Sequence, residues 1–139
     1  MTMQELQWLC VDKFAASTTR AAIMRSLVNV YQELCAASVV GELMVDGSFL
    51  TEKIDPKDVD FVFALDAAKS PQIPTAFAVR DKIVKQQFTH CDSYFYPVYP
   101  IGHPAHAGCL DSRHYWIHQF GFSRSKQTKA IAIISVPSP

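Results

Sequence analysis

Two aspartates separated by one residue, Asp58 and Asp60, are the strongest chemical signal in the sequence. They begin the stretch Asp-Val-Asp-Phe-Val-Phe-Ala-Leu, which is typical of a strand. Side chains alternate across a strand, so both carboxylates point to the same face, about 7 Å apart along the backbone. Two like charges held side by side repel each other unless a cation lies between them. Mg²⁺ prefers carboxylate oxygens and shares its other positions with water and phosphate, so the pair predicts a magnesium site.

A glycine-serine turn lies upstream of this pair. Gly47 and Ser48 follow the short apolar strand expected at 42–46. Glycine permits a sharp turn, and such a turn can present backbone N–H groups and a hydroxyl to phosphate oxygens. A phosphate-contacting turn followed by metal-binding carboxylates is the equipment that phosphoryl transfer needs.

Together these residues resemble a known signature. Gly47-Ser48 followed by Asp58-Val59-Asp60 is similar to the Gly-Ser…Asp-x-Asp pattern of the nucleotidyltransferase superfamily, which includes minimal bacterial nucleotidyltransferases, antibiotic nucleotidyltransferases and DNA polymerase beta. The longer string from Val45 to Lys53, and the later Tyr-Trp…Phe-Gly-Phe segment at 115–122, resemble a small uncharacterised bacterial and phage branch of it.

The resemblance implies a site and an activity. In such families a third carboxylate comes from the next strand, and here Asp92 fits that place. Asp58 and Asp60 would coordinate the metals, Asp92 would also act as the base, and Ser48 would hold the phosphates. A two-metal arrangement of this kind stabilises the attacking and the leaving oxygen. The implied activity is Mg²⁺-dependent transfer of a nucleoside monophosphate from an NTP to an acceptor hydroxyl.

The sequence departs from that pattern after the turn. Many relatives carry an arginine and a second glycine soon after the Gly-Ser pair, whereas this chain has Thr51, Glu52 and Lys53. Lys53 would then supply the positive charge near the nucleotide. The chain also has no room for the extra helical domain of larger relatives, so a protein partner, a homodimer or a small acceptor would complete the site. The alternative function is a catalytically inactive interaction module, such as a toxin–antitoxin or phage-defence component.

Histidine spacing raises a second metal hypothesis. His103, His106 and Cys109 are spaced by three, and His114 and His118 could share one helical face, as zinc ligands do. The first group falls in a Pro/Gly loop, and no cysteine pair completes a finger. Histidines that face solvent or form hydrogen bonds are therefore the competing interpretation, and the sequence leaves both open.

Two further groups have a structural and a functional interpretation. Aromatic residues concentrate late in the chain, where they would mostly cover the sheet, although one or two could stack on a nucleobase: Tyr94, Phe95, Tyr96, Tyr99, Tyr115, Trp116, Phe120 and Phe122. A small basic segment before the last strand is either a solvated hairpin or a contact to the triphosphate or an acidic partner: Arg124, Lys126 and Lys129.

Composition sets the limits of these interpretations. The 139 residues suit a single minimal domain, 1–139, and 49% hydrophobic residues supply a core. A formal net charge of zero argues against a protein that mainly grips nucleic acid, although a nucleic acid acceptor stays open. No apolar run of membrane-spanning length and no signal peptide is present, and the four cysteines are scattered, so we expect a cytoplasmic protein with free thiols.

The elements that would position these residues follow from periodicity. Apolar residues at 23, 27, 30, 31 and 34 predict a helix over 20–37, capped by Thr18 or Thr19, with Arg20 and Arg25 off the apolar stripe and in water. Further helices are expected at 75–88 and from a cap at Asp111 to Gly121, and strands at 42–46, 58–65, 91–99 and 129–136. This order predicts an α+β fold in which helices flank a mixed sheet, with a nucleotidyltransferase-like core.

Overall fold

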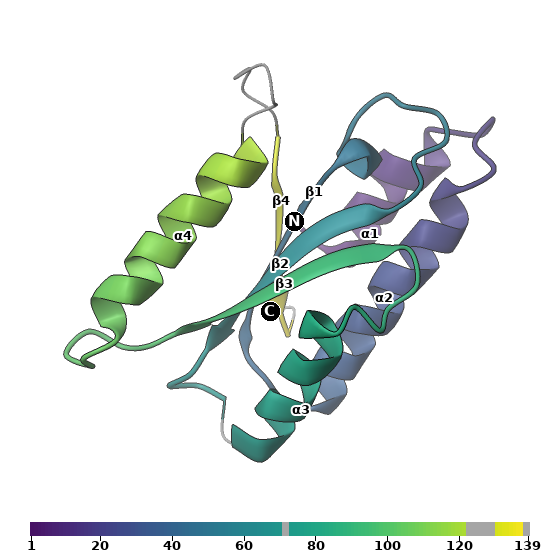
Figure 1. Cartoon of the computed structure of the whole chain (residues 1–139). Coiled ribbons are helices and arrows are strands. Elements are labelled where there is room, and N and C mark those ends of the chain that lie inside the picture. The colour runs from purple at the N-terminus through teal and green to yellow at the C-terminus, as the bar shows by residue number, and fades with distance from the viewer. Residues whose placement is uncertain (71–72, 122–129, 138–139) are drawn as a thin grey trace.

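Helices cover both faces of a four-stranded sheet in the computed structural model, which describes residues 1–70, 73–121 and 130–137 (Figure 1). The elements are, in chain order, helix α1 (Met3–Gln7) continued by a π-helical turn (Trp8–Asp12), helix α2 (Arg20–Ala36), strand β1 (Gly41–Asp46), a 3₁₀ turn (Ser48–Leu50), strand β2 (Val59–Asp66), helix α3 (Ile73–Val84), strand β3 (Cys91–Val98), helix α4 (His106–Gly121) and strand β4 (Ala132–Val136). The predicted α+β class with a mixed, helix-flanked sheet is confirmed.

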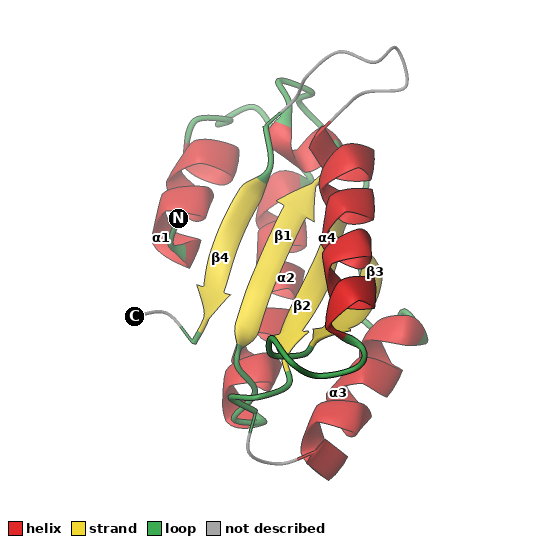
Figure 2. Ribbon diagram, turned by 90° about the vertical axis from the view of Figure 1, so that its left-hand side faces the viewer, coloured by secondary structure: helices red, strands yellow, loops and turns green. Residues whose placement is uncertain are grey.

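The sheet has the strand order β3-β2-β1-β4. β1 runs antiparallel to both β2 and β4, whereas β2 and β3 are parallel, and α3 makes the crossover between them. α1, α2 and α3 lie on one face of the sheet and α4 lies on the other (Figures 1 and 2). The chain therefore forms three layers, with the sheet in the middle.

Strand periodicity divides the core between the two faces. The face toward α2 buries the larger apolar cluster, which includes Leu43, Phe61 and Phe63. The face toward α4 buries a smaller cluster that includes Met44 and Val62. Since side chains alternate along a strand, each residue's position fixes its layer, and even-numbered residues of β1 and β2 face α4.

Helix α2 has the predicted apolar stripe but a different cap. Ile23, Leu27 and the later stripe residues Val30 and Leu34 are buried against the sheet, as their spacing predicts. Thr19 occupies the N-cap position without a side-chain hydrogen bond. The hydroxyl of Ser17 accepts from the backbone N–H of Arg20 at 3.2 Å instead, so Thr19 has the predicted cap position but Ser17 supplies the cap hydrogen bond.

One additional helix and two helix boundaries differ from the sequence prediction. α1 was not predicted, because five residues are too few to show a period, although Thr2 and Glu5 form a capping box around its first turn. α3 ends at Val84 rather than at 88. α4 begins at His106, so Asp111 lies inside this helix and does not cap it.

The largest correction concerns Arg20, which is 1% exposed rather than solvated. Its guanidinium donates to four backbone carbonyls: from Nη1 to Cys10 at 2.9 Å and Phe49 at 2.7 Å, from Nη2 to Thr51 at 2.7 Å, and from Nε to Lys53 at 3.2 Å. A buried charge is tolerated when its hydrogen bonds are satisfied. Arg20 thus joins the N-terminal segment and helix α2 to the loop that follows β1.

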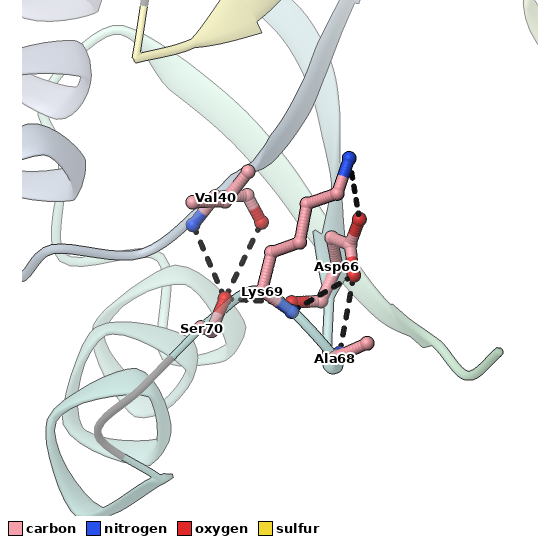
Figure 3. A network of polar contacts seen from close by, with 5 residues as sticks. All are labelled: Val40, Asp66, Ala68, Lys69 and Ser70. Carbon is pink, nitrogen blue, oxygen red and sulfur yellow. Dashed lines mark hydrogen bonds and ion pairs between the residues drawn. The ribbon is translucent and has the colours of Figure 1, made fainter.

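A second polar network closes the opposite end of the sheet (Figure 3). The Asp66 carboxylate accepts from the N–H groups of Ala68 and Lys69, both at 3.1 Å. The Ser70 hydroxyl lies 2.7 Å from the Asp66 carbonyl and accepts from the Val40 N–H at 3.1 Å. The turn after β2 is therefore tied to the connection between α2 and β1.

Two expectations about the whole chain can be compared with the described residues. All four cysteines are free, and Cys10, Cys91 and Cys109 are buried, as the scattered spacing predicted. No helix within the ranges given above combines the length and the apolar character that crossing a membrane requires.

Replacing Arg20 by methionine should lower the free energy of unfolding by about 3 kcal/mol, because the buried carbonyls of Cys10 and Phe49 lose their donor. Urea denaturation of the parent and the variant measures this difference. Arg25→Met is the matched control, since Arg25 lies on the same helix and is exposed. Equal losses in the two variants would contradict the role given to Arg20.

Candidate functional site

Three aspartates form a row across neighbouring strands. Asp46, the last residue of β1, pairs with Asp60 in β2, and Asp60 pairs with Asp92 in β3. Neighbouring strands are about 4.8 Å apart, and residues in register project to the same face. The row therefore brings three carboxyl groups to the α4 face of the sheet, at the end where β1 finishes and β2 and β3 begin.

Sequence reasoning found Asp60 and Asp92 but missed Asp46. This residue is only 4% exposed, and it directly precedes the Gly47 turn. The signal was present, because Asp46 closes the predicted strand 42–46, next to the turn proposed to contact phosphate. Recognising it required the antiparallel pairing of β1 with β2, which sets Asp46 opposite Asp60.

Asp58 lies at the margin of this row. It is exposed and precedes β2, whose first residue Val59 donates its N–H to the His90 carbonyl at 2.9 Å. Burial raises the pKa of the Cys91 thiol to about 12, and the nearby negative charge of Asp58 contributes to the same shift. Asp58 is therefore an exposed charge near the start of β3, whereas Asp60 has strand partners on both sides.

Asp92 and Asp60 share an electrostatic neighbourhood with Tyr94. Burial is the largest cause of the raised pKa of Tyr94, and the charges of Asp92 and then Asp60 raise it further. The Asp92 carboxylate also accepts a hydrogen bond from the Gln86 side-chain amide at 2.9 Å. On β3, the aromatic side chain of Tyr94 therefore lies next to the carboxylate row.

The Gly47 turn is pressed against this row. Gly47 has φ of +87°, and a Cβ placed on it would collide with the Asp60 carboxylate. Ser48 follows at the start of the 3₁₀ turn, which is closed by a bond from the Leu50 N–H to the Gly47 carbonyl at 3.1 Å. Glycine is required here both by the backbone conformation and by the space that the carboxylate occupies.

Lys53 is exposed, and its backbone forms hydrogen bonds on both sides. Its N–H donates to the Thr51 hydroxyl at 3.3 Å, and its carbonyl accepts from Arg20. The loop that carries Lys53 is thus fixed by its main chain, while the ammonium group lies on the surface.

Carboxylates are the residue type that a divalent cation prefers, and Asp46, Asp60 and Asp92 lie in register on adjacent strands. In the ranges that the structure describes, however, no three His, Cys, Asp or Glu side chains are gathered into a group that could hold a metal ion. Asp92, for example, bonds to Gln86. Convergence of the carboxylate oxygens therefore requires side-chain rotation, for which the strand register already provides the spacing.

The loop group of the zinc hypothesis, His103, His106 and Cys109, has other contacts. The His106 ring nitrogen Nδ1 lies 2.8 Å from the Tyr99 carbonyl. His103 stacks on the Tyr99 ring at 4.3 Å and accepts from the Ala105 N–H. The Cys109 thiol donates to the Ala105 carbonyl at 3.2 Å. These bonds hold the loop between β3 and α4 against the helix.

Four residues that the sequence analysis singled out lie outside the described residues. This applies to the basic segment and one aromatic residue: Phe122, Arg124, Lys126 and Lys129.

Comparison with known protein families identifies the family of this chain. A family model described as a family of unknown function, DUF6932, matches residues 1–136. The chain belongs to this family. No curated protein and no solved structure matches it. The match covers the whole sheet, including the carboxylate row and the Gly47 turn, and it assigns no activity to them.

Replacing Gly47 by alanine should lower the free energy of unfolding by about 2 kcal/mol, because the new Cβ meets the Asp60 carboxylate at a backbone conformation that L residues rarely adopt. Thermal or urea unfolding measures the loss. Gly108→Ala is the matched control, since Gly108 is in helix α4 with open space around it, and alanine there should leave stability equal or higher. Unchanged stability of Gly47→Ala would disprove the close approach.

The pKa of Cys91 predicts a loss of stability in alkali. The folded state holds the thiol proton up to about pH 12, whereas the unfolded thiol releases it near its ordinary pKa of 9.0. Between these values the native state binds more protons, so the free energy of unfolding falls as pH rises. Cys91→Ala should show a shallower fall over this window in urea denaturation. Identical slopes in parent and variant would contradict the assignment.

Proposed function

We propose that this protein is a Mg²⁺-dependent nucleotidyltransferase that moves a nucleoside monophosphate from an NTP to an acceptor hydroxyl. The observation that carries the proposal is the row of Asp46, Asp60 and Asp92, which adjoins the Gly47 turn. Carboxylates from adjacent strands beside a tight turn supply metal ligands and backbone donors in one place. The resemblance of Gly-Ser…Asp-x-Asp to the nucleotidyltransferase signature supports the same activity.

The proposed reaction divides roles among the aspartates. The acceptor oxygen attacks the α-phosphorus, a new P–O bond forms, the bond to the β-phosphate breaks, and pyrophosphate leaves. Asp46 is buried, and Asp60 lies on β2 between two neighbouring strands. Both are therefore suited to be metal ligands that stay in place during the reaction. Asp92 is half-buried on β3, the edge strand, where an acceptor can approach and transfer its proton.

A bound cation would offset the negative charge of the row. Three carboxylates on adjacent strands repel each other, and burying one of them adds a desolvation cost. When bound, Mg²⁺ supplies the charge that offsets this repulsion and binds the triphosphate oxygens. Gly47 leaves room for the Asp60 carboxylate, and Ser48 offers its hydroxyl and N–H to phosphate.

The second candidate is a non-catalytic interaction module, as in a toxin–antitoxin or phage-defence pair. Helix α4 favours it, because Leu110, Tyr115 and Ile117 on this helix are large apolar residues exposed to solvent. Single exposed apolar residues are common, whereas several on one helix suit a partner. In this candidate the carboxylates are retained without turnover.

Calorimetric titration of ATP, GTP, CTP and UTP into the purified protein, with and without Mg²⁺, tests the proposal. Binding should require Mg²⁺ and should weaken by roughly a hundredfold in Asp60→Asn and Asp46→Asn, because each removes a charge from the metal site. The matched control is Asp81→Asn, an exposed carboxylate on α3. Equal binding by the parent and the site variants would disprove the site, and no binding by any of them would favour the interaction module.

A further inference from the structure

An aromatic cluster lies next to the carboxylate row. The rings of Tyr94 on β3 and Trp116 on α4 have centroids 4.6 Å apart, and Tyr115 meets Trp116 edge-on at 5.1 Å. Trp116 also meets Phe120 at 5.6 Å, and Phe120 is buried in the smaller core cluster. The cluster is thus anchored at Phe120 and held in a defined arrangement by packing between β3 and α4.

The other end of this cluster is open. Tyr94 is 39% exposed and Tyr115 is 55% exposed, although both lie on elements that contribute to the core. Flat aromatic faces held by neighbouring rings lose little conformational entropy on binding, and they favour other flat π-systems. The exposed rings are therefore suited to a planar ligand.

The short distance from Tyr94 to the carboxylate row favours a ligand that has an anionic part and a planar part. Tyr94 follows Asp92 by two residues, so both project to the same face, about 7 Å apart along the strand. A ligand whose anionic part is held by a cation at the row would extend its next group over these rings.

We propose that Tyr94 and Tyr115, supported by Trp116, form a base-stacking surface that holds the nucleobase of the NTP. This inference rests on the proposed nucleotidyl transfer and names the part of the site that binds the base. Stacking on aromatic side chains tolerates every base, because each has a π-face. All four NTPs should therefore bind, with the larger purines tighter than the pyrimidines.

The experiment compares two ligands that differ only in the base. ATP and ribose 5′-triphosphate are titrated with Mg²⁺ into the full chain, and ATP should bind about tenfold tighter. Tyr94→Leu/Tyr115→Leu should abolish this difference and leave the affinity for ribose 5′-triphosphate unchanged. Tyr94→Phe/Tyr115→Phe keeps both rings and should retain the difference. Phe77→Leu is the matched control, an exposed aromatic on α3, across the sheet.

Tryptophan fluorescence gives an independent readout. The chain has two tryptophans, Trp8 and Trp116, and Trp8 lies on the opposite face with Lys13 over its ring. In a Trp8→Phe background the signal comes from Trp116 alone. ATP should change this emission, and ribose 5′-triphosphate should change it little.

The outcomes separate the two proposals. Equal affinity for ATP and ribose 5′-triphosphate, both dependent on Mg²⁺, would overturn the base-stacking surface and leave the carboxylate site standing. A preference for ATP that survives Tyr94→Leu/Tyr115→Leu would place the base elsewhere and overturn the inference as well. Failure of both ligands to bind would overturn the proposed function and the base-stacking surface together.

Discussion

The buried guanidinium of Arg20 is the interaction on which the arrangement of the site depends. Its donors hold carbonyls of the N-terminal segment and of the loop after β1, and the Phe14 ring lies 3.7 Å from its central carbon. This loop begins with the Gly47 turn, which touches the Asp60 carboxylate. A planar group with several fixed donors can satisfy carbonyls from different segments at once, which a lysine ammonium cannot do in the same geometry. The turn is therefore held in position through the loop that follows it, by a residue that has no part in the proposed chemistry.

The strand topology determines which charges come together. β1 and β2 are antiparallel and β2 and β3 are parallel, so the end of β1 and the beginnings of β2 and β3 meet at one edge. Only this combination places Asp46, Asp60 and Asp92 in a single row. Their even positions also keep them away from the larger core, which the odd residues of β1 and β2 fill on the α2 face. The sheet thus separates the apolar packing that stabilises the fold from the charges that oppose it.

Most of the fold could be predicted from local patterns, whereas the site could be predicted only in part. The stripe on α2 and the β-branched and aromatic strands identified the main elements, alternation set Asp60 on one face with Asp58, and the nucleotidyltransferase resemblance pointed to Asp92 on the next strand. Asp46 and Arg20 were missed for the same physical reason. Asp46 gains its partner through strand pairing, and Arg20 lies in the first turn of α2, where a returning loop and not the sheet covers the helix. Contacts between distant segments leave no periodic trace in the sequence.

The contrast between backbone and side chains also bears on how such a site would work. The strand register fixes the spacing of the carboxylates, while a carboxylate such as that of Asp92 has a protein donor, Gln86. A cation would have to compete with such donors, and the repulsion among three neighbouring carboxylates favours that exchange. Tyr94 extends the same face toward α4, whose packing through Trp116 and Phe120 keeps the aromatic rings in place. The carboxylate row and the planar aromatic surface thus follow one another along β3, in the order in which the nucleotide of the proposal would carry its phosphates and its base.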